Sequence, residues 1–209
     1  MKTILFQGDS ITDCGRGNGL GTGYAFLTTA QLGYECPNEY NFINRGISGN
    51  RIVDVYARIK ADIINLKPDY MSILIGVNDV WHDITRGNGV DNEKFEKIYS
   101  MLIEEIKLAL PDIKIMIFEP FCLEGPATEN CEEIPDRWIR FDTEVKKRAQ
   151  KAKCIAEKYG LKFISLQDKF DEAAKKADNL YWTGDGVHPT PMGHELIKNE
   201  WIKAFKSLK

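Results

Sequence analysis

Short apolar segments rich in β-branched residues alternate along this chain with longer segments of helical periodicity. Strand and helix alternation with almost continuously apolar strands is typical of a parallel sheet covered by helices on both faces. The pattern therefore predicts an α/β fold, a three-layer α/β/α sandwich. The five expected strands are residues 3–6, 40–43, 70–75, 113–118 and 161–165.

Apolar residues spaced three and four apart predict helices between these strands. They are expected over residues 23–32, 52–63, 95–106, 145–156 and 192–208, the last entered after Pro191. The common doubly wound order for five strands is 2-1-3-4-5, which places a ligand crevice at the carboxyl ends of the central strands. Irregular segments at 15–23, 82–92, 121–135 and 177–189 follow strand ends, so substrate contacts are expected there. We expect a single domain over residues 1–209.

The composition is that of an ordinary soluble globular protein, with 43% hydrophobic residues, 28% charged residues and a formal charge of −3. The Lys-rich stretch at 146–153 has helical spacing and is interpreted as a solvated helix face, so no nucleic-acid partner is expected. Neither a secretory segment nor a membrane span is evident, which favours a cytoplasmic protein without a membrane partner.

Histidine and cysteine spacing gives no indication of a metal site. The three histidines form no H-x-x-x-H or H-E-x-x-H pattern, and the five cysteines include no C-x-x-C pair. The G-x-G-x-x-G fingerprint is absent after the first strand. We therefore expect neither a metal nor a dinucleotide cofactor.

Residues able to perform catalysis stand directly after three of the expected strands and again near residue 185. In the predicted order, the turn that follows the first strand lies between those that follow the second and third, so their side chains are expected to converge on Ser10. Each motif alone is compatible with ordinary turn or cap chemistry, but their combination at adjacent strand ends favours a site. The segments are Gly8-Asp9-Ser10, Asn44-Arg45-Gly46-Ile47-Ser48-Gly49-Asn50, Gly76-Val77-Asn78-Asp79 and Asp185-Gly186-Val187-His188.

A serine hydroxyl becomes an effective nucleophile only when a base removes its proton and a third group orients that base. The D-x-x-H spacing of Asp185 and His188 lets one loop present both groups to Ser10. The oxyanion formed on attack needs donors, which the backbone N–H groups of Ser10 and Gly49 and the Asn78 amide are predicted to supply. Gly46 is the alternative to Gly49.

These segments resemble the signature blocks of the SGNH (GDSL) hydrolase family from Ser10 to His188. The resemblance implies a flavodoxin-like fold, with Ser10 as nucleophile, Asp185 and His188 completing the triad, and Gly49 and Asn78 in the oxyanion hole. Segments 8–16, 20–24, 45–50 and 75–81 further resemble intracellular acetylxylan esterases. That implies a small ester or acetylated oligosaccharide as substrate, cleaved through an acyl-enzyme on Ser10, and a homo-oligomeric state.

Two tryptophans stand near the predicted crevice, Trp81 just after Asn78 and Trp182 just before Asp185. Their aromatic faces suit sugar rings, so both are candidate substrate-binding residues, although large hydrophobes also pack under loops. Two other functions fit the same motifs. One is a lipid-directed esterase or thioesterase of the same family, and the other is a non-catalytic carbohydrate-binding protein.

Overall fold

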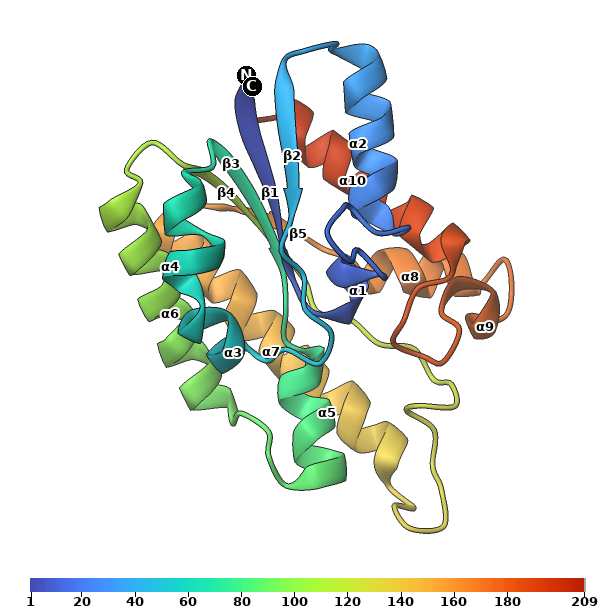
Figure 1. Ribbon diagram of the computed structural model, residues 1–209. Coiled ribbons are helices and arrows are strands. Elements are labelled where there is room, and N and C mark those ends of the chain that lie inside the picture. Colours follow the sequence, from blue (N-terminus) through green and yellow to red (C-terminus); the bar gives the residue numbers. More distant parts are fainter. Residues whose placement is uncertain (209) are drawn as a thin grey trace.

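Strand β1 (Lys2–Gly8) is the second of five parallel strands in the computed structural model, which describes residues 1–208 (Figure 1). It pairs with β2 (Tyr40–Asn44) on one side and with β3 (Tyr70–Leu74) on the other. The sheet continues through β4 (Lys114–Phe118) to β5 (Lys162–Ile164) at the far edge. The order β2-β1-β3-β4-β5 confirms the predicted topology and the α/β class.

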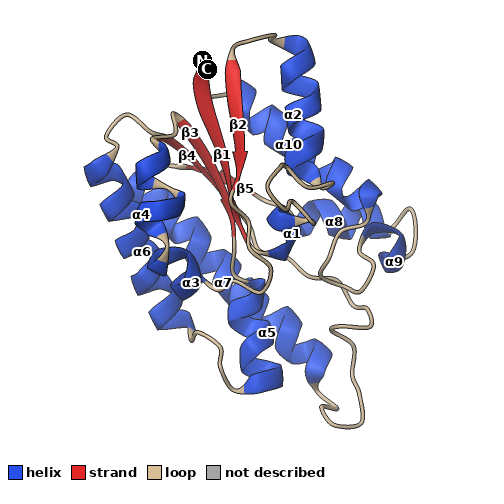
Figure 2. Cartoon of the chain, viewed as in Figure 1, coloured by secondary structure: helices blue, strands red, loops and turns tan. Residues whose placement is uncertain are grey.

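Helices cover both faces of this sheet (Figure 2). Strand side chains alternate between the two resulting cores, because successive residues of a strand point to opposite faces. Ile4 and Phe6 of β1 belong to one buried cluster, and Leu5 between them belongs to the other. The first core includes side chains of α2 (Tyr24–Glu35) and α10 (Pro191–Lys206).

The second core is closed mainly by helices from the middle of the chain. Apart from the strands, most of its buried side chains come from three helices, and α7 reaches into both cores because its amino-terminal half also contacts the first one. The three helices are α3 (Ile52–Ala57), α6 (Asn92–Ala109) and α7 (Arg137–Tyr159). A sheet buried on both faces explains why its strands are almost continuously apolar.

Shorter helices follow the carboxyl ends of β1, β3 and β5, and two of them carry the motif residues Ser10 and Asn78. Helix α1 (Ser10–Asp13) starts just after β1, and α5 (Val77–Arg86) starts three residues after the end of β3. After β5 come α8 (Gln167–Ala174) and α9 (Asn179–Trp182).

Two of the predicted elements need correction. The helix expected over 52–63 is interrupted at Arg58, and α3 is followed by α4 (Ile59–Asp62) and a 3₁₀ turn (Ile64–Leu66). Arg58 stands at this break, where its guanidinium donates hydrogen bonds to Gln7 and to the Arg45 carbonyl. The loop expected over 82–92 begins only after Arg86, because α5 extends through residues 82–86.

Both ends of the described chain lie at the amino-terminal edge of the sheet (Figure 1). The Lys2 ammonium is 5.6 Å from the centre of the Tyr70 ring, and that of Lys114 is 5.8 Å from it. Lys114 also donates to the Leu208 carbonyl. Among the helices of residues 1–208, none is sufficiently long and apolar to cross a membrane.

Trp201 of α10 provides a test of the first core. Its fully buried ring lies 5.4 Å from that of Phe6 and 4.9 Å from that of Phe205, measured between centroids. We expect Trp201→Ala to lower the free energy of unfolding by about 3–5 kcal/mol because it leaves a cavity. Tyr34→Ala, at a position 88% exposed, should change it by less than about 0.5 kcal/mol. Denaturant unfolding measures both, and equal losses would contradict this description of the core.

Candidate active site

Ser10 is presented by a sharp change of direction at the end of β1. Gly8 has φ +157°, and a Cβ placed there would lie 2.3 Å from the Leu74 carbonyl oxygen, so only glycine fits. Asp9 caps α1 by accepting a hydrogen bond from the Ile11 N–H at 3.0 Å. Ser10 is the first residue of that helix and is only partly buried. Its hydroxyl is therefore fixed in place and open to a ligand.

His188 and Asp185 meet Ser10 from the loop that follows α9. The Ser10 Oγ lies 2.8 Å from His188 Nε2, and His188 Nδ1 lies 2.7 Å from Asp185 Oδ2. The other carboxylate oxygen of Asp185 accepts the backbone N–H groups of Val187 and His188 at 2.9 and 2.8 Å. The short D-x-x-H spacing thus folds into one turn that holds both side chains in line with Ser10.

Charge and hydrogen bonding determine which nitrogen of His188 carries the proton. Partial burial raises the pKa of Asp185, but the hydrogen bonds from His188 and Val187 outweigh it and bring that pKa down to about 2. An ionised carboxylate can only accept, so the neutral His188 ring donates its Nδ1–H to Asp185. Its Nε2 then accepts from the Ser10 hydroxyl.

Two carboxylates raise the pKa of His188 above its ordinary value. The hydrogen bond to Asp185 has the largest effect, and the charges of Asp185 and Asp9 add to it against the opposing effect of burial. Asp9 itself is fully buried, and that burial raises the pKa of its carboxyl group to about 7. Its Oδ2 has no hydrogen-bond partner within residues 1–208.

Three donors surround the Ser10 hydroxyl without being fully used elsewhere. Neither the Ser10 nor the Gly49 backbone N–H has a hydrogen-bond partner among residues 1–208. Asn78, which is 5% exposed, donates from Nδ2 to the Asn50 carbonyl at 3.2 Å and keeps its second amide hydrogen. All three residues line the same cavity. They can therefore stabilise a negative oxygen there.

The geometry also discriminates between the two glycines that follow β2. The Gly46 N–H donates to Asn44 Oδ1 at 2.9 Å, and a Cβ on Gly46 would lie 2.3 Å from the backbone nitrogen of Asp13. Gly46 therefore lets the chain pass close to α1 and has no donor to spare. Gly49, with φ +79° and open space around it, lines the cavity instead. The observed positions favour Gly49 over Gly46.

Asp79, the neighbour of Asn78, has a supporting position. Its buried carboxyl group accepts the Ile52 N–H at 3.1 and 3.2 Å, which ties the start of α3 to α5. The segment before α3, which contains Gly49, is thereby held against the segment that contains Asn78. This contact was not foreseen from the sequence.

The cavity beside Ser10 has a volume of about 430 Å³. Trp81 lines it, with its ring 5.7 Å from that of His188. Trp182 does not line it and instead borders a separate cavity between α8 and α10. Trp81 is thus the tryptophan at the Ser10 cavity, and a contact of Trp182 with substrate stays a prediction. The complete lining is Ser10, Ser48, Gly49, Asn78, Trp81, His82, Arg86 and His188.

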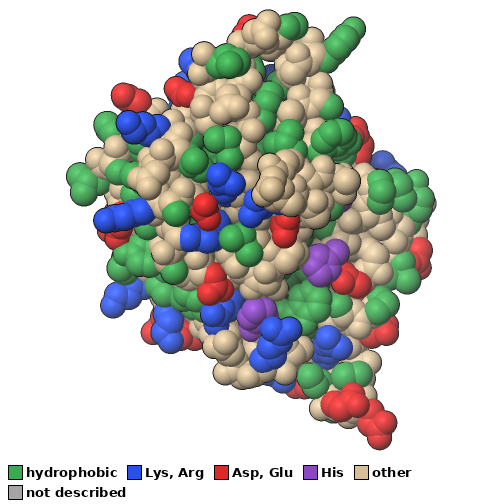
Figure 3. All heavy atoms as spheres, in the orientation of Figure 1, with side chains coloured by type: hydrophobic (Ala, Val, Ile, Leu, Met, Phe, Trp, Pro, Cys, Tyr) green, Lys and Arg blue, Asp and Glu red, His purple; other side chains and the backbone are tan. Residues whose placement is uncertain are grey.

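His82 and Arg86 line the cavity but were not predicted as site residues from the sequence. A signal for them exists, since Val77, Val80 and Ile84 are spaced as one buried helix face. Recognising that helix would have placed Asn78, His82 and Arg86 together, because residues four apart lie on the same side. On the face seen in Figure 3, Lys and Arg side chains gather around a histidine over α5.

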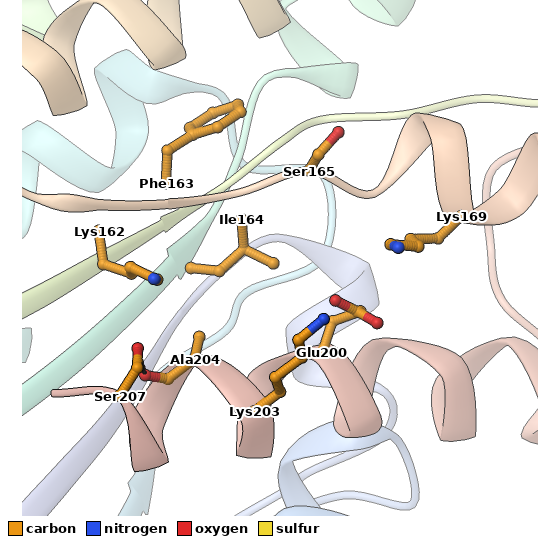
Figure 4. A pocket seen from close by; sticks show the side chains of 9 residues that line it. All are labelled: Lys162, Phe163, Ile164, Ser165, Lys169, Glu200, Lys203, Ala204 and Ser207. Atoms are coloured by element: carbon orange, nitrogen blue, oxygen red, sulfur yellow. Dashed lines mark hydrogen bonds between the residues drawn. The ribbon is translucent and has the colours of Figure 1, made fainter. Parts of the chain in front are cut away.

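Another hollow, of about 290 Å³, lies between the edge strand β5 and α10 (Figure 4). Lysines 162, 169 and 203 border it together with Glu200. No histidine lines it, so its serines have no base of the kind that faces Ser10. Within residues 1–208, no three His, Cys, Asp or Glu side chains are grouped so that they could hold a metal ion.

A serine hydroxyl aligned with an imidazole and a carboxylate, beside free N–H donors at the carboxyl edge of a parallel sheet, is the arrangement of a serine hydrolase. The sequence agrees with this class. The chain belongs to the GDSL-like lipase/acylhydrolase family, whose model matches residues 6–196.

Relatives with solved structures share this fold over almost their whole length. A GDSL-like lipase from Parabacteroides merdae, described as putative, is 36% identical, with a TM-score of 0.90 over 98% of this chain and 95% of that one. Axe2, an acetylxylan esterase from Geobacillus stearothermophilus, is 32% identical, with a TM-score of 0.83 over 97% and 93%. An acetylxylan esterase from the same organism is 33% identical among curated proteins, covering 97% of this chain and 93% of the relative.

The pKa values of the three histidines provide a test of the electrostatics of the site. We expect His188 to titrate above pH 6.5 because of Asp185, and His82 below pH 6.5 because of burial and the nearby arginines. Burial and the charge of His188 lower the pKa of His194 to about 4. Asp185→Asn should lower the pKa of His188 while the other two change little. NMR titration resolves all three, and a His188 pKa below that of His82 would contradict the described contacts.

Proposed function

We propose that this protein removes small acyl groups, above all acetyl groups on xylo-oligosaccharides or related sugars, through an acyl-enzyme on Ser10. The observation that carries the proposal is the aligned pair of contacts, 2.8 Å from Ser10 to His188 and 2.7 Å from His188 to Asp185. The acetylxylan esterases among its relatives support the choice of substrate.

The first half of the reaction forms the acyl-enzyme. Ser10 Oγ attacks the ester carbonyl carbon as its proton moves to His188 Nε2. The carbonyl oxygen becomes negative and accepts hydrogen bonds from the Ser10 and Gly49 N–H groups and from the Asn78 amide. The imidazolium that forms is stabilised by the Asp185 carboxylate. His188 then gives its proton to the sugar oxygen, the carbon–oxygen bond breaks, and the alcohol leaves.

The second half returns the enzyme to its starting state. Neutral His188 takes a proton from a water molecule, whose oxygen attacks the acyl carbon on Ser10. The same three donors stabilise the second oxyanion. When that intermediate collapses, the Ser10 oxygen leaves and receives the proton from His188, and a carboxylic acid is released.

The cavity lining favours a short acyl group on a polar alcohol. Trp81 is the only large apolar side chain among the lining residues, and the others are serine, glycine, asparagine, histidine and arginine. A long acyl chain would require an extended apolar wall. An aromatic ring beside polar groups instead suits a sugar ring, so Trp81 is the candidate to contact it.

Graded losses are expected from two substitutions on an aryl acetate. Ser10→Ala should lower kcat by about 10⁶-fold, the size of the loss when a triad nucleophile is removed. Asn78→Ala should lower it by about 10²- to 10³-fold through the loss of one oxyanion donor. Asn199→Ala, at an exposed position on α10, is the control and should leave kcat unchanged. Substantial turnover by a folded Ser10→Ala variant would refute the mechanism.

Acyl-chain length separates the sugar deacetylase from a lipid-directed esterase or thioesterase of the same family. On a single aryl leaving group, kcat/KM should fall sharply beyond acetyl or propionyl because the lining offers no apolar channel. Esters from acetyl to octanoyl provide the series, with acetylated xylose oligomers compared alongside. A rate that rises with chain length would favour the lipid-directed alternative.

A further inference from the structure

One face of α5 leads from the reacting centre along the cavity. Asn78, His82 and Arg86 are spaced four residues apart, and all three line the cavity together with Ser10. Eight residues of α-helix extend about 12 Å at 1.5 Å per residue. The cavity wall therefore begins at the Asn78 amide and ends at the Arg86 guanidinium. A small acyl group alone would not span the distance between them.

Arg86 has neither an ion-pair nor a hydrogen-bond partner among residues 1–208. No carboxylate of residues 1–208 lies within ion-pair distance of its side chain, which also makes no hydrogen bond there. The nearest acid along the helix, Asp83, lies against Gly89 instead. Arg86 is exposed, so its guanidinium is available to a ligand that enters the cavity.

The other basic side chains near this wall are neutralised or uncharged, which distinguishes them from Arg86. Arg51, which is also close to His82, is neutralised by Asp54 through contacts of 2.9 and 3.1 Å. His82 is held neutral near pH 7, because burial and the two arginines lower its pKa. No Asp or Glu lines the cavity. Among the side chains that line the cavity, Arg86 is therefore the one that carries a fixed positive charge.

We propose that Arg86 forms an anion subsite that selects ester substrates carrying a carboxylate, such as an acetylated oligosaccharide that includes a uronic acid. The guanidinium is suited to this ligand because its planar N–H groups match a carboxylate with two parallel hydrogen bonds. The subsite deepens the proposed function and rests on it, since it assumes that the ester is held at Ser10.

A matched pair of substrates tests the subsite. One is an acetylated oligosaccharide with a uronic acid, and the other is the same compound with that carboxyl group as its methyl ester. The wild-type protein should favour the acid by about two- to fivefold in kcat/KM, the usual effect of a solvent-exposed ion pair. In 1 M NaCl the preference should disappear, because the screening length falls to about 3 Å.

Arg86→Gln should bring the ratio of the two kcat/KM values to about one, whereas Arg86→Lys should keep part of the preference. Lys60→Gln makes the same change in net charge at an exposed position on α4, outside the cavity, and should preserve both the ratio and the basal rate. A wild-type ratio of one, or an unchanged ratio in Arg86→Gln, would show that Arg86 only complements the carboxyl end of α5.

The outcome for Arg86 can be separated from that for the proposed function. Absence of turnover on every acetyl ester would contradict the proposed function. The subsite would then be tested by calorimetry with the deacetylated acid and its methyl ester. Weaker binding of the acid by Arg86→Gln than by the wild-type protein supports the subsite, and equal binding refutes it.

Discussion

The tight contact between the end of β1 and the end of β3 is the constraint on which the site depends. The backbone at Gly8 passes so close to the Leu74 carbonyl that no side chain fits there. Because residue 8 is glycine, β1 can turn directly into α1, with Ser10 at the first position of that helix. Pairing of β1 with both β2 and β3 then brings the Gly49 and Asn78 segments to either side of that serine. The order of the strands thus determines where the Gly49 and Asn78 donors lie, as well as how the core is packed.

Electrostatic coupling inside this frame joins groups that are far apart in the sequence. Asp9 is in the turn before Ser10, while Asp185 comes from the other end of the chain, and both carboxylates raise the pKa of His188. The two contribute differently. Asp185 makes a direct hydrogen bond and remains ionised, whereas the buried Asp9, with a pKa of about 7, changes its charge near neutral pH. The basicity of His188 therefore depends on both elements being in place.

Much of this arrangement could be predicted from the sequence, because it follows from local rules. The alternating segments led to the correct sheet order, and the D-x-x-H spacing led to a loop that presents both side chains to Ser10. The predictions were less successful where tertiary contacts decide. Trp182 is adjacent to the site in sequence but lines another cavity, so its contact with substrate stays a prediction. The break at Arg58 lies where that side chain bonds to groups outside its own helix.

The position of the chain ends has a practical consequence. The Lys2 ammonium lies over the Tyr70 ring, and the Leu208 carbonyl bonds to Lys114, which lies over the same ring. Both are at the edge of the sheet opposite the turn that carries Ser10. A short linker could join such ends, and new termini could be opened in an exposed loop. The scaffold is thus suited to circular permutation, and to attachment to a solid support near residues 2 and 208, at the edge of the sheet away from Ser10 (Figure 1).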